Sequence, residues 1–289
     1  MLQRALNLND YWHFGCHISE LQHDSSYVNI KFHNAELFIL KENEKYRAYE
    51  NICLHRGSKL VQEDKGIWNK KCPYHGVIYE KGVPINVDEL GLEKSKKRIH
   101  LIEFKIQRVG DFLFFTNNEN TKSFKDQYGI ETYDHLKKIS KIIENPISDE
   151  SYTYDCRWEV AIENALEPLH LEEIHPETLN TLQLSRAKNK EYDESVIWNH
   201  EVENKKIFNG LKKLKKLFAD DFNECYHSSY LFPYFFISST FSTEDMPSWV
   251  AISDRVFRFF NLSVRYFANK SGVLEESGQS FRPTPKKLA

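Results

Sequence analysis

Two short segments, Cys53-Leu54-His55-Arg56-Gly57 and Cys72-Pro73-Tyr74-His75-Gly76, determine how the first part of this chain folds. Each segment pairs one cysteine with one histidine and ends in a glycine that suits a tight loop. Together they offer two sulfur and two nitrogen ligands, the set that holds a [2Fe–2S] cluster with two Cys on one iron and two His on the other. The same side chains could hold zinc, although zinc sites usually open with Cys-x2–4-Cys and close with His-x3–5-His.

The residues around these two segments have the alternating pattern of short β-strands. We expect strands at 27–32, 36–40, 45–49, 104–109 and 111–116, the last two forming a hairpin around Gly110. The two metal-binding segments are therefore expected in loops at the tips of a small β domain. The backbone N–H groups of Gly57 and Gly76 are candidate hydrogen-bond donors to the cysteine sulfurs.

Length, composition and charge limit the class of protein. The chain has 289 residues, of which 40% are hydrophobic and 28% charged, so a packed interior is feasible. A net charge of -3 argues against nucleic acid as a partner. No run approaches eighteen apolar residues and no signal peptide precedes the first strands, so we expect a cytoplasmic protein without a membrane span. Cys16, Cys156 and Cys225 are expected to be reduced thiols.

The composition changes near residue 120. A polar stretch at 117–126 predicts a linker, which divides the chain into domains at 1–120 and 121–289. Beyond it, helical spacing covers 163–174, and strand patterns cover 226–241, 248–260 and 262–267. A basic amphipathic helix is expected within 205–222. It could cover the core, close over a pocket, dock an acidic electron donor or lie on a membrane surface.

A second candidate metal site follows the linker. His170 and His175 are five residues apart, so both imidazoles converge only if the helix is distorted or ends between them. Two imidazoles and one carboxylate on one face of an iron ion form the facial triad of non-haem Fe(II) oxygenases. Taken alone, a His-x4-His pair is weak evidence for a metal site.

The order Cys-x-His, sixteen residues, Cys-x2-His resembles that of the Rieske proteins. With the segment Trp158–His175 after it, the chain resembles the oxygenase component (α subunit) of Rieske non-haem iron oxygenases, the family that includes aromatic-ring-hydroxylating dioxygenases. Tyr11-Trp12 and Leu231-Phe232-Pro233-Tyr234 also resemble segments of that family. The resemblance implies an α+β fold. An N-terminal all-β Rieske [2Fe-2S] domain comes first, followed by a catalytic domain with an antiparallel sheet flanked by helices, of helix-grip or START-like type.

The resemblance also implies roles for particular residues. Cys53 and Cys72 hold the buried iron of the cluster, while His55 and His75 hold the outer iron. His170 and His175 hold a mononuclear Fe(II), and Glu167 stands where the family has an Asp that passes electrons between subunits. The family takes its third iron ligand from an Asp late in the catalytic domain. The candidates for that ligand here are Asp254, Asp245, Glu275 and Glu276, and water is the remaining alternative.

The function implied by the resemblance is oxygenation of a small organic substrate with O2, by hydroxylation, dihydroxylation or oxidative demethylation. Electrons would come from a separate NAD(P)H-dependent reductase, with or without a ferredoxin between the two proteins. The assembly implied is a head-to-tail homotrimer, in which neighbouring centres approach one another. The alternative is a Rieske electron-transfer protein, or an inactive oxygenase homologue that lacks a complete mononuclear iron site. A zinc-stabilised binding protein is the third possibility.

Overall fold

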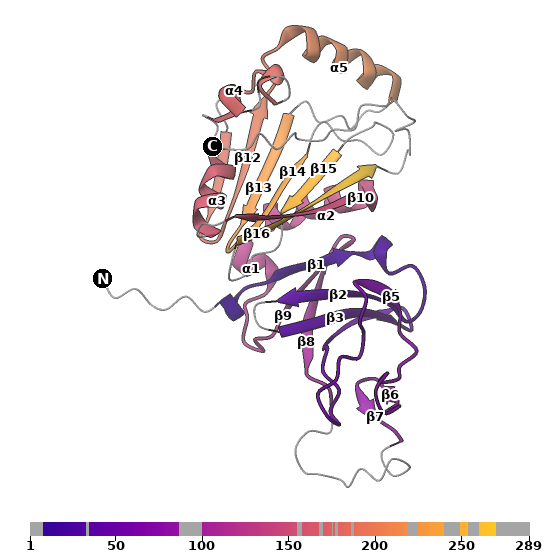
Figure 1. Cartoon of the computed structure of the whole chain (residues 1–289). Helices are drawn as coiled ribbons and strands as arrows, with labels where there is room; N and C mark the ends of the chain where they lie inside the picture. The colour runs from indigo at the N-terminus through magenta and orange to yellow at the C-terminus, as the bar shows by residue number, and fades with distance from the viewer. Residues whose placement is uncertain are drawn as a thin grey trace, which may run out of the picture.

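The computed structural model describes most of the chain between residues 8 and 269. The described ranges are 8–32, 35–86, 100–154, 158–167, 170–174, 176, 179–185, 188–218, 225–239, 249–253 and 260–269. Two seven-stranded sheets dominate this part of the chain (Figure 1).

The first sheet has the strand order β1-β9-β8-β4-β3-β2-β5, and all its pairings are antiparallel. A two-stranded sheet, β6 and β7, lies below it in Figure 1. All five strands expected from the sequence are present, including the hairpin at Gly110. The bounds are β1 His13–His17, β2 Ser26–Phe32, β3 Ala35–Glu42, β4 Lys45–Glu50, β5 Lys65–Ile67, β6 Tyr79–Glu80, β7 Val83–Pro84, β8 Glu103–Val109 and β9 Phe112–Thr116.

The second sheet has the order β10-β16-β15-β14-β13-β12-β11 and is also antiparallel throughout. Its strands are β10 Ile143–Tyr154, β11 Lys188–Tyr192, β12 Ser195–Glu201, β13 Cys225–Leu231, β14 Phe235–Ser239, β15 Trp249–Ser253 and β16 Phe260–Asn269. The helices are α1 Phe124–Tyr128, α2 Ile130–Ile142, α3 Trp158–Leu166, α4 His170–Ile174 and α5 Lys205–Phe218. Three short 3-10 turns complete the elements, η1 Leu8–Asp10, η2 Ile18–Glu20 and η3 Leu179–Leu182. The expected α+β class is confirmed.

Two expectations about helices and linkers were wrong in detail. The helix expected over 163–174 is two helices, α3 and α4, with Glu167 between them. Pro168 explains the break, because a proline disfavours helical backbone in the residue before it. The linker expected over 117–126 is shorter, because α1 begins at Phe124 and is capped by Ser123, whose Oγ accepts a hydrogen bond from the Asp126 N–H at 3.2 Å. The domain division at residue 120 stays a prediction.

One hydrophobic core joins the two sheets. The strands β1 and β9 are buried on both faces, so alternate residues enter two different cores. Phe14 and Phe114 face a core that also contains Phe124 of α1 and Phe235 of β14. The opposite face of the same strands packs against β2 and β3. The first sheet is therefore a rigid support for both the cluster loops and the second sheet.

Buried polar contacts fasten the same junction. Tyr128 donates a hydrogen bond to the Phe232 carbonyl at 2.9 Å, and His17 Nε2 donates to the Ser140 carbonyl at 2.8 Å. His13 lies between the Leu8 carbonyl and the Tyr234 hydroxyl, at 2.8 and 2.9 Å. These two histidines are therefore hydrogen-bonded structural residues within the core.

Candidate metal centres

The two ligand-bearing loops share one backbone pattern. In each loop the Cys N–H donates to the carbonyl five residues later, at 2.7 Å in both, and the Gly N–H donates back to the Cys carbonyl, at 2.9 and 3.1 Å. Gly57 and Gly76 both adopt positive φ, +73° and +76°, a conformation that glycine reaches without strain. The paired loops therefore present Cys53 and Cys72 in equivalent places. The glycine N–H groups bond these carbonyls, so the expectation that they point at sulfur was wrong.

The four ligand side chains separate into an inner pair and an outer pair. Cys53 and Cys72 are each only 2% exposed, and burial together with the neighbouring Cys72 thiol raises the pKa of Cys53. His55 and His75 are less buried, and their ring centroids lie 4.7 Å apart. His55 Nδ1 is buried and has no hydrogen-bond partner. A buried, unpartnered ring nitrogen beside a second imidazole suits a metal ligand.

The arrangement fits two metal ions better than one. A structural zinc ion needs four side chains that converge on a single point. A [2Fe–2S] cluster instead takes two sulfurs at its buried end and two imidazoles at its outer end. The residues present therefore fit the cluster.

Tyr79 was not singled out by the sequence, yet it contacts the inner ligand. Its hydroxyl lies 3.2 Å from Cys53 Sγ and accepts a hydrogen bond from the Leu54 N–H at 2.9 Å. The ring is 1% exposed, and burial raises the pKa of Tyr79 well above its ordinary value, so the hydroxyl keeps its proton. A donor to a cluster sulfur adjusts the reduction potential. No local pattern signals this contact, because Tyr79 is simply a buried residue of β6.

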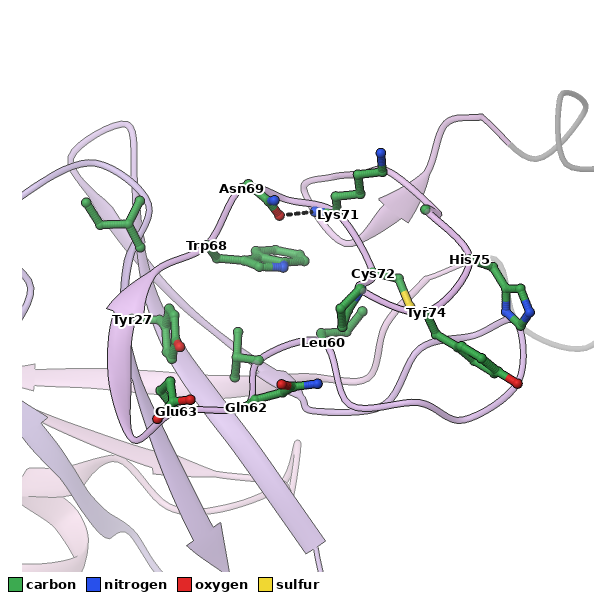
Figure 2. Close-up of a pocket in the computed structure, with 14 residues that line it drawn as sticks. Tyr27, Leu60, Gln62, Glu63, Trp68, Asn69, Lys71, Cys72, Tyr74 and His75 are labelled. Atoms are coloured by element: carbon green, nitrogen blue, oxygen red, sulfur yellow. Dashed lines mark hydrogen bonds between the residues drawn. The ribbon is translucent and has the colours of Figure 1, made fainter.

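A groove of about 700 Å³ opens beside the second ligand loop (Figure 2). Trp68 and Tyr27 line one part of it, and Cys72, Tyr74 and His75 line the other. Tyr74 packs on the His75 ring, with 3.8 Å between centroids, yet it remains 65% exposed. The outer iron ligand therefore borders an accessible surface with an aromatic side chain at its edge.

The downstream site is described only in part. Glu167 is half-buried and follows α3, and its N–H donates to the Glu163 carbonyl at 3.0 Å. His170 begins α4, which ends at Ile174, so one continuous helix does not join the two histidines. The side chain of His170 and the whole of His175 lie outside the described residues, as do Asp254, Asp245, Glu275 and Glu276. Their convergence on a mononuclear iron stays a prediction.

Among the described residues, no helix has the length and apolarity that a membrane crossing requires.

Comparisons with known proteins agree with these features. Residues 11–90 match the family model of the Rieske [2Fe-2S] domain. The glycine betaine monooxygenase oxygenase subunit of Pseudomonas aeruginosa is 28% identical over 157 residues, which are 52% of this chain and 35% of that protein. The carnitine monooxygenase oxygenase subunit of Acinetobacter pittii is 24% identical, over 61% of this chain and 49% of that protein. The match therefore spans a third to a half of these relatives' length.

A solved structure shares the fold. The quaternary ammonium Rieske monooxygenase CntA, in complex with an inhibitor, aligns with a TM-score of 0.71 at 18% identity, over 89% of this chain and 68% of that one. The fold therefore matches that of a Rieske oxygenase well beyond the cluster domain. The chain is a homologue of the oxygenase subunits of Rieske non-haem iron oxygenases, and it carries its Rieske [2Fe-2S] domain at residues 11–90.

Proposed function

We propose that this chain is the oxygenase component of a Rieske-type system that uses O2 to hydroxylate or demethylate a small organic substrate. The observation that carries the proposal is the inner pair of thiols and outer pair of imidazoles in two equivalent loops, attached to a second antiparallel sheet. The relatives named for glycine betaine and carnitine make quaternary amines the first substrate class to test.

When bound, the cluster takes up and releases one electron at a time, and a ferrous ion in the second site activates O2. The residues of this chain hold and tune these groups. Cys53 and Cys72 hold the buried iron, and His55 and His75 hold the outer one. Tyr79 donates to the Cys53 sulfur.

Downstream, we assign His170 and His175 to the mononuclear iron and Asp254 to its third ligand. Glu167 would accept a hydrogen bond from a neighbouring subunit and so position that subunit's cluster domain beside the second site. The break between α3 and α4 supports this assignment, because Glu167 lies outside both helices and its carboxylate is not confined to a helical face.

The proposed assembly is a head-to-tail homotrimer. Within one chain the cluster loops and α4 belong to different halves of the molecule (Figure 1). The cluster end exposes Arg56, Lys71 and the Tyr74 ring, whereas α4 exposes Glu172, Glu173 and Ile174. Opposite charges around exposed apolar side chains suit contact between successive copies. An NAD(P)H-dependent reductase, with or without a ferredoxin, supplies the electrons.

A second candidate function is a Rieske electron carrier or an inactive homologue. It rests on the cluster loops, which the structure describes completely, whereas the structure describes the second site only in part. The two candidates share the cluster and differ only at the second site.

Iron content and turnover separate the two functions. We expect about three irons per chain in anaerobically purified protein and a Rieske-type EPR signal. His170→Ala should leave about two irons, keep the EPR signal and abolish product formation, while His23→Ala, at an exposed position, should change neither. Two irons in the unmodified protein, with no product from any quaternary amine or aromatic acid, would support the electron carrier. Colourless protein with one zinc would refute both.

A further inference from the structure

The helix α5 has an unusual distribution of charge. Its fourteen residues, Lys205–Phe218, include six lysines and no acidic residue, although the whole chain has a net charge of -3. Ile207, Leu211, Leu214 and Phe218 are spaced three or four apart, which is the period of one side of a helix. Two of the lysines precede Ile207, and the other four lie between Leu211 and Phe218. A surface helix usually mixes the two signs of charge, because like charges four residues apart destabilise it.

The beginning of α5 is anchored by a small apolar cluster and by Asn204, whose Oδ1 accepts from the Lys206 N–H at 3.1 Å. Ile207 and Phe208 pack with Val202 and two further leucines, Leu182 and Leu184, apart from the three larger cores. Lys205, Lys206 and Lys213 are exposed. A Cβ added to Gly210 would meet nothing within 4 Å, so open space borders the helix at this point.

The position of α5 in the molecule indicates which kind of partner it can bind. The helix lies at the end of the molecule opposite β6 and β7, the strands next to the cluster loops (Figure 1). An acidic electron donor has to approach a cluster, and α5 is remote from the cluster of its own chain. A lysine-rich surface about 21 Å long instead suits an extended anionic plane. Each lysine near an anionic membrane surface contributes about 1 kcal/mol of attraction.

We propose that α5 attaches this protein to the anionic surface of a phospholipid membrane. The exposed lysines attract the anionic lipid headgroups, while the apolar side of the helix, which begins at Ile207, packs on the protein. The attachment is peripheral and reversible, it leaves the cluster loops free, and it adds to the proposed oxygenase function without depending on it.

Sedimentation with sucrose-loaded vesicles tests the proposal on the full chain with its cluster. We expect binding to phosphatidylcholine vesicles that contain about one third phosphatidylglycerol, little binding to pure phosphatidylcholine, and release at about 0.5 M salt. The variant Lys212→Gln, Lys213→Gln, Lys215→Gln, Lys216→Gln should weaken binding about fivefold for each lysine removed. The matched control replaces four exposed lysines outside α5, Lys45, Lys122, Lys137 and Lys141, by Gln and should bind as the unmodified protein does.

The absorption spectrum of the cluster shows that each variant is folded. Equal binding to neutral vesicles, no binding to anionic vesicles at low salt, or an equal loss in the control would overturn the proposal. Slower cluster reduction by an acidic redox protein in the α5 variant, without vesicle binding by the unmodified chain, would assign the helix to an electron donor and also overturn it. Because the assay needs no turnover, its failure leaves the oxygenase proposal intact.

Discussion

Removal of the Tyr79 hydroxyl tests how the chain adjusts its cluster. In the loaded protein Cys53 is a thiolate and can only accept a hydrogen bond, so the hydroxyl at 3.2 Å must be the donor. The Leu54 N–H donates to the same hydroxyl oxygen at 2.9 Å and so occupies one of its lone pairs. The hydroxyl proton is then free to point at the Cys53 sulfur.

The expected change in potential follows from the charge on the cluster. A hydrogen bond to a charged group contributes about 1.5–3 kcal/mol, and the reduced cluster carries one more negative charge than the oxidised one. If the bond is stronger by about 1 kcal/mol in the reduced state, its loss lowers the midpoint potential by about 40 mV, since 59 mV corresponds to a tenfold change for one electron. Tyr79→Phe should therefore make the cluster harder to reduce.

Spectroelectrochemical titration of the anaerobic protein measures this shift directly. Tyr49→Phe is the matched control, because Tyr49 is buried to the same 1% in the same core and its hydroxyl makes no hydrogen bond to a cysteine sulfur. Its midpoint potential should equal that of the unmodified protein. An unchanged or higher potential in Tyr79→Phe, with full iron content, would show that the hydroxyl does not act on the sulfur.

Two further predictions concern stability. Burial lowers the pKa of His135 to about 3 and that of His227 to about 4, from an ordinary value near 6.5. Below pH 6.5 the unfolded chain therefore binds protons that the folded chain does not, and the free energy of unfolding falls as the pH drops, by roughly 2 kcal/mol per histidine at pH 5. Urea unfolding measures this free energy at pH 7 and at pH 5. The difference between the two pH values should be smaller for His135→Leu than for the unmodified protein, and an equal difference would contradict this reasoning. Gly110→Ala should lower the free energy of unfolding by about 1–3 kcal/mol, because φ is +63° and the new Cβ would lie 2.7 Å from the Lys137 carbonyl oxygen. Gly210→Ala should raise it by about 1 kcal/mol, because Gly210 lies in a helix and a Cβ there meets nothing within 4 Å. Equal unfolding midpoints for these two glycine variants would be the contrary result.

The β-strands of the first half were predictable because their pattern is local. Alternation at 27–32 and the glycine between 104–109 and 111–116 specify strands and a hairpin within a few residues. The helix over 163–174 was predicted as continuous because apolar spacing outweighed Pro168. Pro168 disfavours helical backbone at Glu167, the residue before it, and the helix therefore ends at Leu166.

At the cluster, the ligands were predictable and their surroundings were not. The identities and spacing of Cys53, His55, Cys72 and His75 are properties of two short segments. The hydrogen bond from Tyr79 to sulfur and the pairing of the glycine N–H groups with cysteine carbonyls depend on how those segments pack. Residues of different loops become hydrogen-bond partners only when folding brings them close together, and their spacing in the sequence does not show this.

The amino-acid sequence by itself determined which atoms can bind metal, because ligand type is a covalent property, and it determined most of the strands, because alternation is periodic along the chain. Only the tertiary structure decided that the Tyr79 hydroxyl contacts the Cys53 sulfur, and that aromatic residues of both halves form one continuous core. The physical reason is that these contacts join residues far apart in the sequence, such as Cys53 with Tyr79, or Phe14 with Phe235. Such packing is selected by the burial of apolar surface over the whole molecule.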